Sequence, residues 1–402
     1  MQKIIIKNFR AIEYAEIELK KVLVLIGEQA TGKSTIAKLI YFFKTIQDDF
    51  FNYVYETGSV NLEEVVKVTF RDFFGFIQLD FEIEFQYRND KKIIIRQSNN
   101  QINIEALNIL DEKNIKSLQN DFEQLKQIKD ERKSDLANRK ALIRLEFEQR
   151  RDLSRNIDKL FNALQRDKLY VIAGRNVTVS YSEIFNQYLD TKIQLEIRTG
   201  QKRNDSTDEK LMLKFIEHTK LIKDIYLILK EEVTDISNDK KKEILYNKFS
   251  KKYEYILKAK YKISEESDEQ LILENGKSIA LSDASSGQQE VIRILQDLLF
   301  LIFDNQKFLR IIEEPEAHLF PITQKELIEL LALAVNYQPE NQLIIATHSP
   351  NILTVFNNLL FANRVVEKNP DAKGGGEAIV EEDFWLKAED FSAYALGRDD
   401  DD

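Results

Sequence analysis

Residues 22–35 constrain the fold more than any other stretch, because an apolar run leads directly into a G-x-x-x-x-G-K-[ST] sequence. The run Val22–Ile26 predicts a buried strand, and Ile36–Ile40 continues with the spacing of a helix. A phosphate-binding loop requires this context of strand, glycine-rich turn and helix. The stretch therefore predicts that the chain binds a nucleotide.

The loop residues have separate predicted roles. Gly27 and Gly32 let the backbone curl so that its N–H groups point at an anion, and the helix adds the positive end of its dipole. Lys33 is predicted to reach the β- and γ-phosphates, and the Ser34 hydroxyl to hold Mg²⁺. The predicted nucleotide-binding set at this loop is Gly27, Glu28, Ala30, Thr31, Gly32, Lys33, Ser34 and Thr35.

Composition narrows the class of protein. The chain has 402 residues, 43% of them hydrophobic, which is enough for a sizeable core. It has no cysteine, so disulfides and cysteine-based metal sites are excluded. No apolar run approaches the ~20 residues of a membrane helix, and the N-terminus does not resemble a signal peptide. We expect a soluble cytoplasmic protein with no membrane partner. The net charge of −10 means that any contact with nucleic acid is local.

The N-terminal third predicts strands around one helix. Strands are expected at Ile4–Ile6, Ala15–Leu19 and Val22–Ile26, followed by a helix from Ser34 to about Gln47. Residues 65–104 have strand character, and an antiparallel meander is expected over Phe81–Tyr87, Lys91–Arg96 and Ile102–Ile104.

The composition of the chain changes near Glu105, and no glycine or proline follows until beyond Lys168. Apolar residues step by three and four at Leu118, Phe122 and Leu125, and again from Leu153 to Leu164. We interpret this as two antiparallel helices folded back near residues 130–140, a coiled-coil hairpin. A single long helix is the alternative.

Helices are also expected over residues 181–195 and 210–262. The second ends in a lysine-rich stretch from Lys240 with interspersed tyrosines and Phe249. Such a stretch can follow a phosphate backbone, but it is more often a solvated helix face whose aromatic side chains point to the core. Asn275-Gly276 between two apolar runs then predicts a hairpin.

Three C-terminal segments carry candidate site residues. Ser285 to Gln289 precede a helix from Val291 to Phe303 and form a capped start where an anion can bind. The strand Phe308–Ile312 ends in Glu313, a candidate for Mg²⁺, and Glu314, a candidate general base. A further strand over residues 343–346 ends in Thr-His-Ser, where His348 is placed to contact a γ-phosphate.

The order of these four segments resembles the ABC-type ATPase heads of the SMC and RecF class. It is more similar still to bacterial AAA-like ATPases of the OLD family and of defence systems. The phrases that carry the resemblance are Asn8–Arg10, Ser286–Gln289, Glu313–Leu319 and Ala346–Pro350. It covers residues 1–105 and 268–396. The signature has Ser-Ser-Gly-Gln-Gln where transporters have Leu-Ser-Gly-Gly-Gln, which argues against a transporter subunit.

The resemblance implies ATP as the nucleotide and a role for each motif. Glu313 and Glu314 would form Walker B, Ala317–Leu319 the D-loop and His348 the switch histidine, and Gln78 would be the Q-loop glutamine beside the metal. Ser285, Ser286, Gly287 and Gln288 would be the signature that closes over the γ-phosphate held by a second copy.

The implied fold is an α/β, ABC-type P-loop NTPase head with an antiparallel β subdomain and an inserted helical region. The expected division is an N-terminal lobe at 1–105, a helical or coiled-coil insertion at 106–265 and a C-terminal lobe at 266–402.

Two functions fit the resemblance. The first is an ATPase sensor or scaffold of an anti-phage system of the PARIS or Septu type, which controls a separate nuclease or toxin. The alternative is a DNA-repair or chromosome-maintenance ATPase whose heads clamp DNA. After residue 380 only a short segment with an acidic end follows, so we expect the chain to hydrolyse ATP without carrying a nuclease domain of its own.

Overall fold

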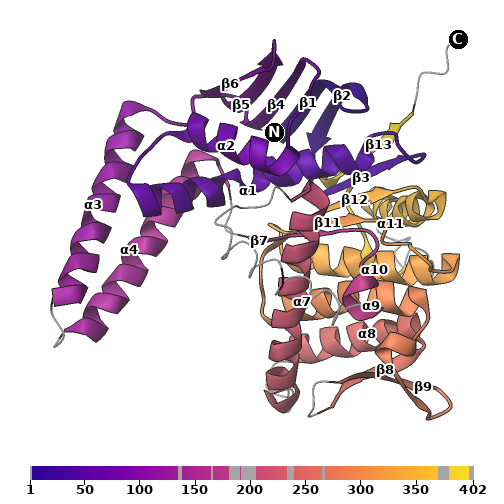
Figure 1. The fold of residues 1–402 in the computed structure, drawn as a ribbon. Helices are drawn as coiled ribbons and strands as arrows, with labels where there is room; N and C mark the ends of the chain where they lie inside the picture. The colour runs from indigo at the N-terminus through magenta and orange to yellow at the C-terminus, as the bar shows by residue number, and fades with distance from the viewer. Residues whose placement is uncertain are drawn as a thin grey trace, which may run out of the picture. The chain divides into compact units, whose positions relative to one another are not determined.

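The computed structural model describes residues 2–134, 138–163, 166–180, 191, 205–232, 240–264, 268–369 and 380–397 (Figure 1). The chain forms two compact units. Unit 1 comprises Met1–Leu19 and Ala30–Gln165, and unit 2 comprises Lys20–Gln29 and Arg166–Asp402. The predicted three-part division of the head remains a prediction, whereas these two units are what the contacts within the chain define.

Unit 1 contains an antiparallel sheet with the order β2-β1-β4-β5-β6. Its strands are β1 (Gln2–Phe9), β2 (Ile12–Leu19), β4 (Phe81–Arg88), β5 (Lys91–Ser98) and β6 (Gln101–Leu107). Every second residue of β4 is buried, which is the alternation that predicted a half-buried strand. The antiparallel meander over β4, β5 and β6 is confirmed.

Two helices of unit 1 follow the phosphate loop in the chain. Helix α1 (Lys33–Thr57) is longer than predicted and ends where Gly58 adopts a left-handed conformation. Helix α2 (Leu62–Phe74) lies where residues 65–74 were predicted to be strand, so that prediction was wrong. Asn61 caps α2 by accepting a hydrogen bond from the Glu64 N–H at 3.1 Å. The apolar residues that suggested a strand line one helix face instead, and they are Val65, Val66, Phe70, Phe73 and Phe74.

Helices α3 (Glu112–Ser134) and α4 (Arg139–Leu160) form a hairpin, which confirms the prediction of two helices over a single long one (Figure 1). Contacts between them run in opposite directions along the chain. Asp121 accepts from Asn156 at 2.9 Å, Gln149 donates to Gln124 at 2.7 Å and Arg132 pairs with Glu146 at 2.7 Å. Within the hairpin, apolar residues of the predicted seam are buried, namely Leu118, Leu125, Leu153 and Ile157.

Unit 2 is built on a parallel sheet with the order β13-β3-β12-β11-β7. Its strands are β3 (Val22–Gly27), β7 (Asp167–Val171), β11 (Phe308–Glu313), β12 (Gln342–Thr347) and β13 (Phe391–Leu396). All residues of β11 and β12 are buried, as expected for central strands covered on both faces. Neither β7 nor β13 was predicted as a strand, and β7 lies within the range predicted as a helical insertion.

Unit 2 also contains helices and a second, small antiparallel sheet. The helices are α5 (Val177–Ser180), α7 (Thr207–Glu232), α8 (Lys240–Leu257), α9 (Ser286–Phe303), α10 (Pro321–Tyr337) and α11 (Pro350–Lys368). The small sheet has strands β8 (Ala259–Ile263), β9 (Glu269–Leu273) and β10 (Ser278–Ala280). Its β9–β10 hairpin is the predicted one, but residues 259–262 were predicted as helix and form β8 instead.

Short 3₁₀ helices complete unit 2 at Leu281–Asp283, Glu382–Phe384 and Ala388–Asp390. The helix predicted over residues 181–195 lies outside the described residues except for Thr191, and the glycine loop at residues 374–376 lies outside them entirely. Within the described part of the chain, no helix is both long and apolar enough to span a membrane.

Arg310 lies in the middle of β11 with no exposed surface, although a charged residue is unexpected in a buried strand. Its guanidinium donates to both Asp297 oxygens, at 2.7 and 2.8 Å, and to Asp167 at 2.5 Å. Asp297 also contacts His218 at 2.7 Å. Burial alone would raise the pKa of Asp297, but the charge of Arg310 outweighs burial and holds that pKa well below its usual range.

We predict that Arg310→Met lowers the free energy of unfolding by about 3–5 kcal/mol, because Asp297 then stays buried without its cation. Urea denaturation measures the loss. Lys307→Gln is the matched control, since Lys307 forms a partly exposed pair with Glu340 and its removal costs about 1 kcal/mol or less. Equal losses in the two variants would contradict the prediction.

Candidate functional site

The phosphate loop has the local geometry that its sequence predicts. Strand β3 ends at Gly27, and α1 begins at Lys33 after a turn in which Ala30 has φ 63° and Gly32 has φ 93°. A Cβ at residue 32 would lie 2.7 Å from Cγ1 of Ile12, so only glycine fits at this position. No side chain caps the start of α1, and no acidic residue lies in its first turn. An anion fits this helix start better than any cation.

The predicted ligand side chains lie at that helix start. Lys33, Ser34 and Thr35 form the first turn of α1, and the Ile36 N–H donates to the Gly32 carbonyl at 2.9 Å. These residues would hold the phosphates of ATP, and Ser34 would contribute a hydroxyl to Mg²⁺.

The other predicted motifs meet at one edge of the parallel sheet in unit 2. Ile26 pairs with Thr347, and Ala346 pairs with Glu313. Gly27, the last residue of β3, lies at the same carboxyl edge as Glu314 and His348, which follow directly on the ends of β11 and β12. Open parallel sheets bind ligands at this edge, so the positions fit a nucleotide site.

Glu313 is buried and held by two donors. Its carboxylate accepts from the Tyr170 hydroxyl at 2.7 Å and from the Ala173 N–H at 3.2 Å. Burial raises the pKa of Tyr170, and the charge of Glu313 raises it further, so the phenol remains a donor. Among the described residues, no group of three or more His, Cys, Asp or Glu side chains converges as a metal site. Mg²⁺ at Glu313 would therefore take its other ligands from hydroxyl, phosphate and water oxygens.

Glu314 is the more accessible of the two carboxylates, with 38% of its side chain exposed. Its backbone has φ 43°, and its N–H donates to the Ala346 carbonyl at 2.8 Å. The Nδ1 atom of His348 lies 3.6 Å from one Glu314 oxygen. A half-exposed carboxylate on a fixed backbone can polarise a water molecule, which is the role predicted for Glu314.

Glu316 was not predicted as a site residue, yet it positions the predicted switch histidine. One of its buried oxygens accepts from the Thr347 hydroxyl at 2.5 Å and from the His348 N–H at 3.1 Å, and lies 3.6 Å from His348 Nδ1. A carboxylate two residues beyond Glu314 is the only sequence signal that could have indicated it.

The signature segment begins helix α9, which starts at Ser286 and not at Val291 as predicted. The Ser285 hydroxyl accepts from the Gln288 N–H, and the Gln288 side chain accepts from the Ser285 N–H at 3.1 Å, which completes a capping box. A Cβ at Gly287 would lie 2.6 Å from the His318 carbonyl, so this glycine permits close packing of α9 on the predicted D-loop.

A buried ion pair anchors α9 to the small sheet. Arg293 donates to both oxygens of Glu269, at 2.5 and 2.9 Å, and Lys223 pairs with the same carboxylate. Burial alone would raise the pKa of Glu269, but Arg293 and Lys223 outweigh burial and lower it from 4.5 to about 2.

Because the pKa of Glu269 is lower in the folded state, we predict that this pair stabilises the protein above the ordinary carboxyl pKa and that the contribution is lost as pH falls through the folded value. The two pKa values correspond to about 3 kcal/mol, lost between about pH 5 and about pH 2. Urea denaturation of wild type and Glu269→Gln across this range measures it. The stability difference between the two proteins should shrink as pH falls, and a constant difference would contradict the prediction.

Gln78, the predicted Q-loop glutamine, lies in unit 1 in the exposed segment between α2 and β4. Ser34 also belongs to unit 1, whereas Glu313 belongs to unit 2. The assignment of Ser34, Glu313 and Gln78 to a metal stays a prediction.

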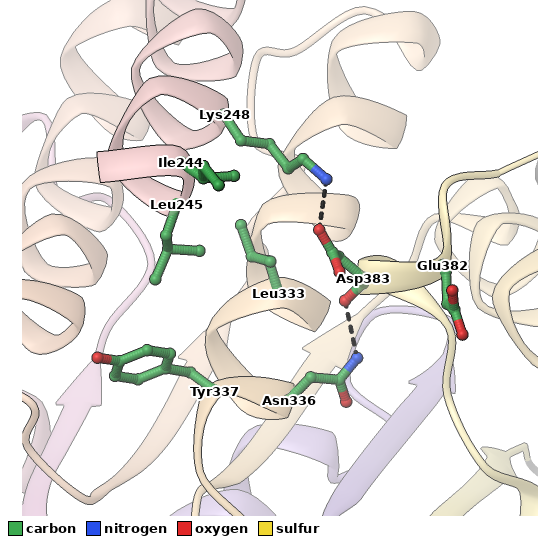
Figure 2. Close-up of a pocket in the computed structure, with 8 residues that line it drawn as sticks. All are labelled: Ile244, Leu245, Lys248, Leu333, Asn336, Tyr337, Glu382 and Asp383. Carbon is green, nitrogen blue, oxygen red and sulfur yellow. Dashed lines mark hydrogen bonds and ion pairs between the residues drawn. The ribbon is translucent and has the colours of Figure 1, made fainter. Parts of the chain in front are cut away.

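The two cavities described in unit 2 lie elsewhere. One, of about 470 Å³, is shown in Figure 2, where Lys248 pairs with Asp383 and Asn336 donates to the Asp383 carbonyl at 3.1 Å. Its remaining lining residues are Ile244, Leu245, Leu333, Tyr337 and Glu382. The other, of about 410 Å³, is lined by Lys21, Val22 and residues of the 336–391 region. Neither contains a residue predicted to bind nucleotide.

The lysine-rich stretch of α8 is partly internal. Lys252 pairs with Glu326 and Glu329, and Lys248 pairs with Glu381 and Asp383. Phe249, Tyr253 and Tyr261 are buried in the core of unit 2. These contacts favour the solvated-face interpretation over nucleic-acid binding for this stretch.

The profile of the AAA ATPase domain family matches residues 1–353, so the chain belongs to this family. Membership makes it an ATPase, and the strand, loop and helix at residues 22–57 are its predicted P-loop. No curated protein matches the chain.

Several solved structures align with the chain at low identity. The Smc head domain of Pyrococcus furiosus, bound to the C-terminal domain of ScpA, is 12% identical with a TM-score of 0.37, over 88% of this chain and 92% of that one. The SMC head domain of Thermotoga maritima is 10% identical with a TM-score of 0.37, over 88% and 90%. The recombination mediator RecF is 12% identical with a TM-score of 0.33, over 87% and 93%. The family assignment rests on the family profile and not on these scores.

Proposed function

We propose that the chain binds ATP with Mg²⁺ at residues 27–35 and hydrolyses it as an ABC-type head that closes on a second copy of itself. The observation that carries the proposal is the carboxyl edge of the parallel sheet. Gly27 and Glu313 are the last residues of their strands there, and Glu314 and His348 follow directly on β11 and β12. Each would hold or activate a different part of one reacting assembly.

The residues divide the chemistry between them. Lys33 and the N–H groups at the start of α1 would bind the phosphates and stabilise the charge that develops during transfer. Glu313, fixed by Tyr170 and Ala173, would orient the metal through oxygen. Glu314 would accept a proton from the attacking water, and His348 would donate to the γ-phosphate.

We expect Lys33→Ala to abolish ATP binding, because the phosphates then lose the ammonium group that pairs with them. Glu314→Gln should keep binding and lower hydrolysis by about 100-fold or more, because an amide does not accept the proton. Equilibrium binding of a fluorescent ATP analogue and phosphate release measure the two steps. Glu389→Gln, an exposed carboxylate outside the site, is the control and should leave both unchanged. Hydrolysis by Glu314→Gln at the wild-type rate would exclude the assigned role.

The signature surface supports closure on a second copy. Ser285 and Ser286 are exposed at the start of α9, whereas Gly287 behind them is packed on the D-loop carbonyl. Phe320, which follows the D-loop, is 79% exposed. A polar helix start beside an exposed aromatic side chain fits an interface that forms only when ATP is bound.

We predict that Ser286→Arg leaves ATP binding by one copy intact and blocks closure, because it places bulk and positive charge in a packed site. Light scattering of Glu314→Gln with ATP, with and without Ser286→Arg, measures the dimer. Ser278→Arg, on the exposed strand β10, should keep the dimer. Equal dimer fractions in all three proteins would reject the proposed interface.

For the biological role, we propose the sensor or scaffold subunit of an anti-phage system that controls a separate nuclease or toxin. Support comes from the motif resemblance to the PARIS and Septu ATPases, and from Lys248 and Lys252 of α8, which pair with carboxylates of unit 2. The alternative is a DNA-repair or chromosome-maintenance ATPase. Co-purification with proteins encoded beside it would favour the first role, and stimulation of hydrolysis by DNA ends would favour the second.

A further inference from the structure

The outer face of α4 carries a pattern that the proposed function does not use. The inner face of this helix contacts α3 through Glu146, Gln149 and Asn156 and buries Leu153. At 100° per residue, the opposite face is formed by residues that lie within about 80° of one another. They are Lys140, Arg144, Phe147, Arg151 and Arg155, and all are exposed. We call this set the α4 stripe.

The α4 stripe is cationic in an acidic protein. Helix α4 has seven basic and four acidic residues, whereas the whole chain carries a net charge of −10. Lys140, Arg144 and Arg151 have no ion-pair partner among the residues that the structure describes. Arg155 has a loose pair with Asp152 at 3.4 Å. Lys248 and Lys252 of α8, in contrast, pair with carboxylates of unit 2.

The neighbouring Arg150 has a structural role on the same helix, because it packs on aromatic rings of α1. Its guanidinium lies 4.9 Å from the ring centre of Tyr55 and 5.6 Å from that of Phe51, both on α1 within unit 1. It therefore helps to fix the hairpin to α1. Arg144 and Arg151 make no such contact, so packing within the described chain does not account for them.

Phe147 lies at the centre of the α4 stripe with 65% of its surface exposed. An aromatic side chain between unpaired cations is the arrangement with which proteins bind single-stranded nucleic acid, where bases stack on the ring and cations follow the phosphates. The stripe extends over about 22 Å, enough for several successive phosphates of one strand. Glu148 and Asp152 flank it on one side only, which leaves the other side open to an anion.

We propose that the α4 stripe is a binding surface for single-stranded nucleic acid, with Lys140, Arg144, Arg151 and Arg155 on the phosphates and Phe147 stacked on a base. The inference goes beyond the proposed function, which assigns no ligand to the hairpin. Its test measures nucleic-acid binding and not ATP hydrolysis, so that the two proposals fail separately.

The test uses fluorescence anisotropy of the full chain with a labelled thymidine oligonucleotide of about 15 residues, at several salt concentrations. Arg144→Gln with Arg151→Gln should weaken binding about 10-fold or more and make the slope of log affinity against log salt shallower by about 1.4. Phe147→Ala should weaken single-strand binding by about 5-fold or more and leave duplex binding unchanged.

The matched control is Lys113→Gln with Lys116→Gln, which removes the same charge from exposed positions of α3. It should keep both the affinity and the salt slope, and all variants should keep wild-type ATP hydrolysis as a measure of folding. An unchanged slope in the arginine variant overturns the proposal. Duplex binding as tight as single-strand binding, with no effect of Phe147→Ala, overturns the single-strand assignment. Equally tight binding of polyglutamate would assign the stripe to an acidic protein surface instead.

Discussion

The buried guanidinium of Arg175 holds the carboxyl edge of unit 2 together. It has no exposed surface and donates to the carbonyls of Ile172, Glu313 and Glu314 at 2.9–3.2 Å, and to the Glu290 carbonyl at 3.0 Å. Burial lowers the pKa of Arg175 from its usual value, and the surrounding carboxylates, Glu290 first, oppose that effect. Backbone carbonyls beyond the last strand pair would otherwise be buried without donors, at a cost that one arginine removes.

This arginine also relates two motifs that are far apart in the sequence. Glu313 ends β11 and Glu314 follows it, in the predicted Walker B segment, and Glu290 lies in the second turn of α9, which begins in the predicted signature. One planar group with fixed donor geometry contacts both, so their relative position is set to within a hydrogen-bond length. The left-handed backbone of Glu314 is part of the same arrangement, because its carbonyl accepts from Arg175 while its N–H pairs with Ala346. The general-base candidate therefore has a fixed main chain and a partly exposed side chain.

Features that depend on residues close together in the sequence could be predicted, whereas features that depend on distant residues could not. The phosphate loop depends on neighbouring residues alone, so its strand, its turn and the start of its helix were predicted to within a residue. The end of α1 was not, because the helix continues from the predicted end near Gln47 to Thr57. The Asn275-Gly276 hairpin, which also depends on neighbouring residues, was predicted as well. Residues 65–74 were misassigned because the spacing of Val65, Val66 and the phenylalanines fits both a strand and a helix. Asn61 caps the segment at its start, which favours the helix. Strands β7 and β13 gain their identity only by pairing with β11 and β3, which no local pattern encodes.

The site residues also fall into those with a local sequence signal and those that depend on distant partners. Glu313, Glu314, Lys33 and His348 stand out because charged or catalytic residue types follow apolar strands. Tyr170, Arg175 and Glu316 have no such signal, since each matters through a partner that is distant in the chain or lies on another strand. An arginine at position 310 is unexpected in a buried strand because its side chain is charged. Its ion pairs with Asp297 and Asp167 make burial of the guanidinium possible. A charged residue in a predicted core strand is thus a reason to search for a buried partner before the strand is rejected.

The location of basic residues says more about a possible nucleic-acid surface than their number does. A net charge of −10 disfavours nucleic acid as a general partner, and the lysine-rich stretch was the obvious exception. The structure reverses that ranking, because carboxylates of unit 2 neutralise Lys248 and Lys252 while Arg144 and Arg151 have no ion-pair partner in the described chain. Residue counts favour α8, whereas ion pairing favours the outer face of α4. A cation that a carboxylate already neutralises contributes less to counterion release from a phosphate backbone, so ion pairing indicates better than residue counts where an acidic ATPase can bind a polyanion.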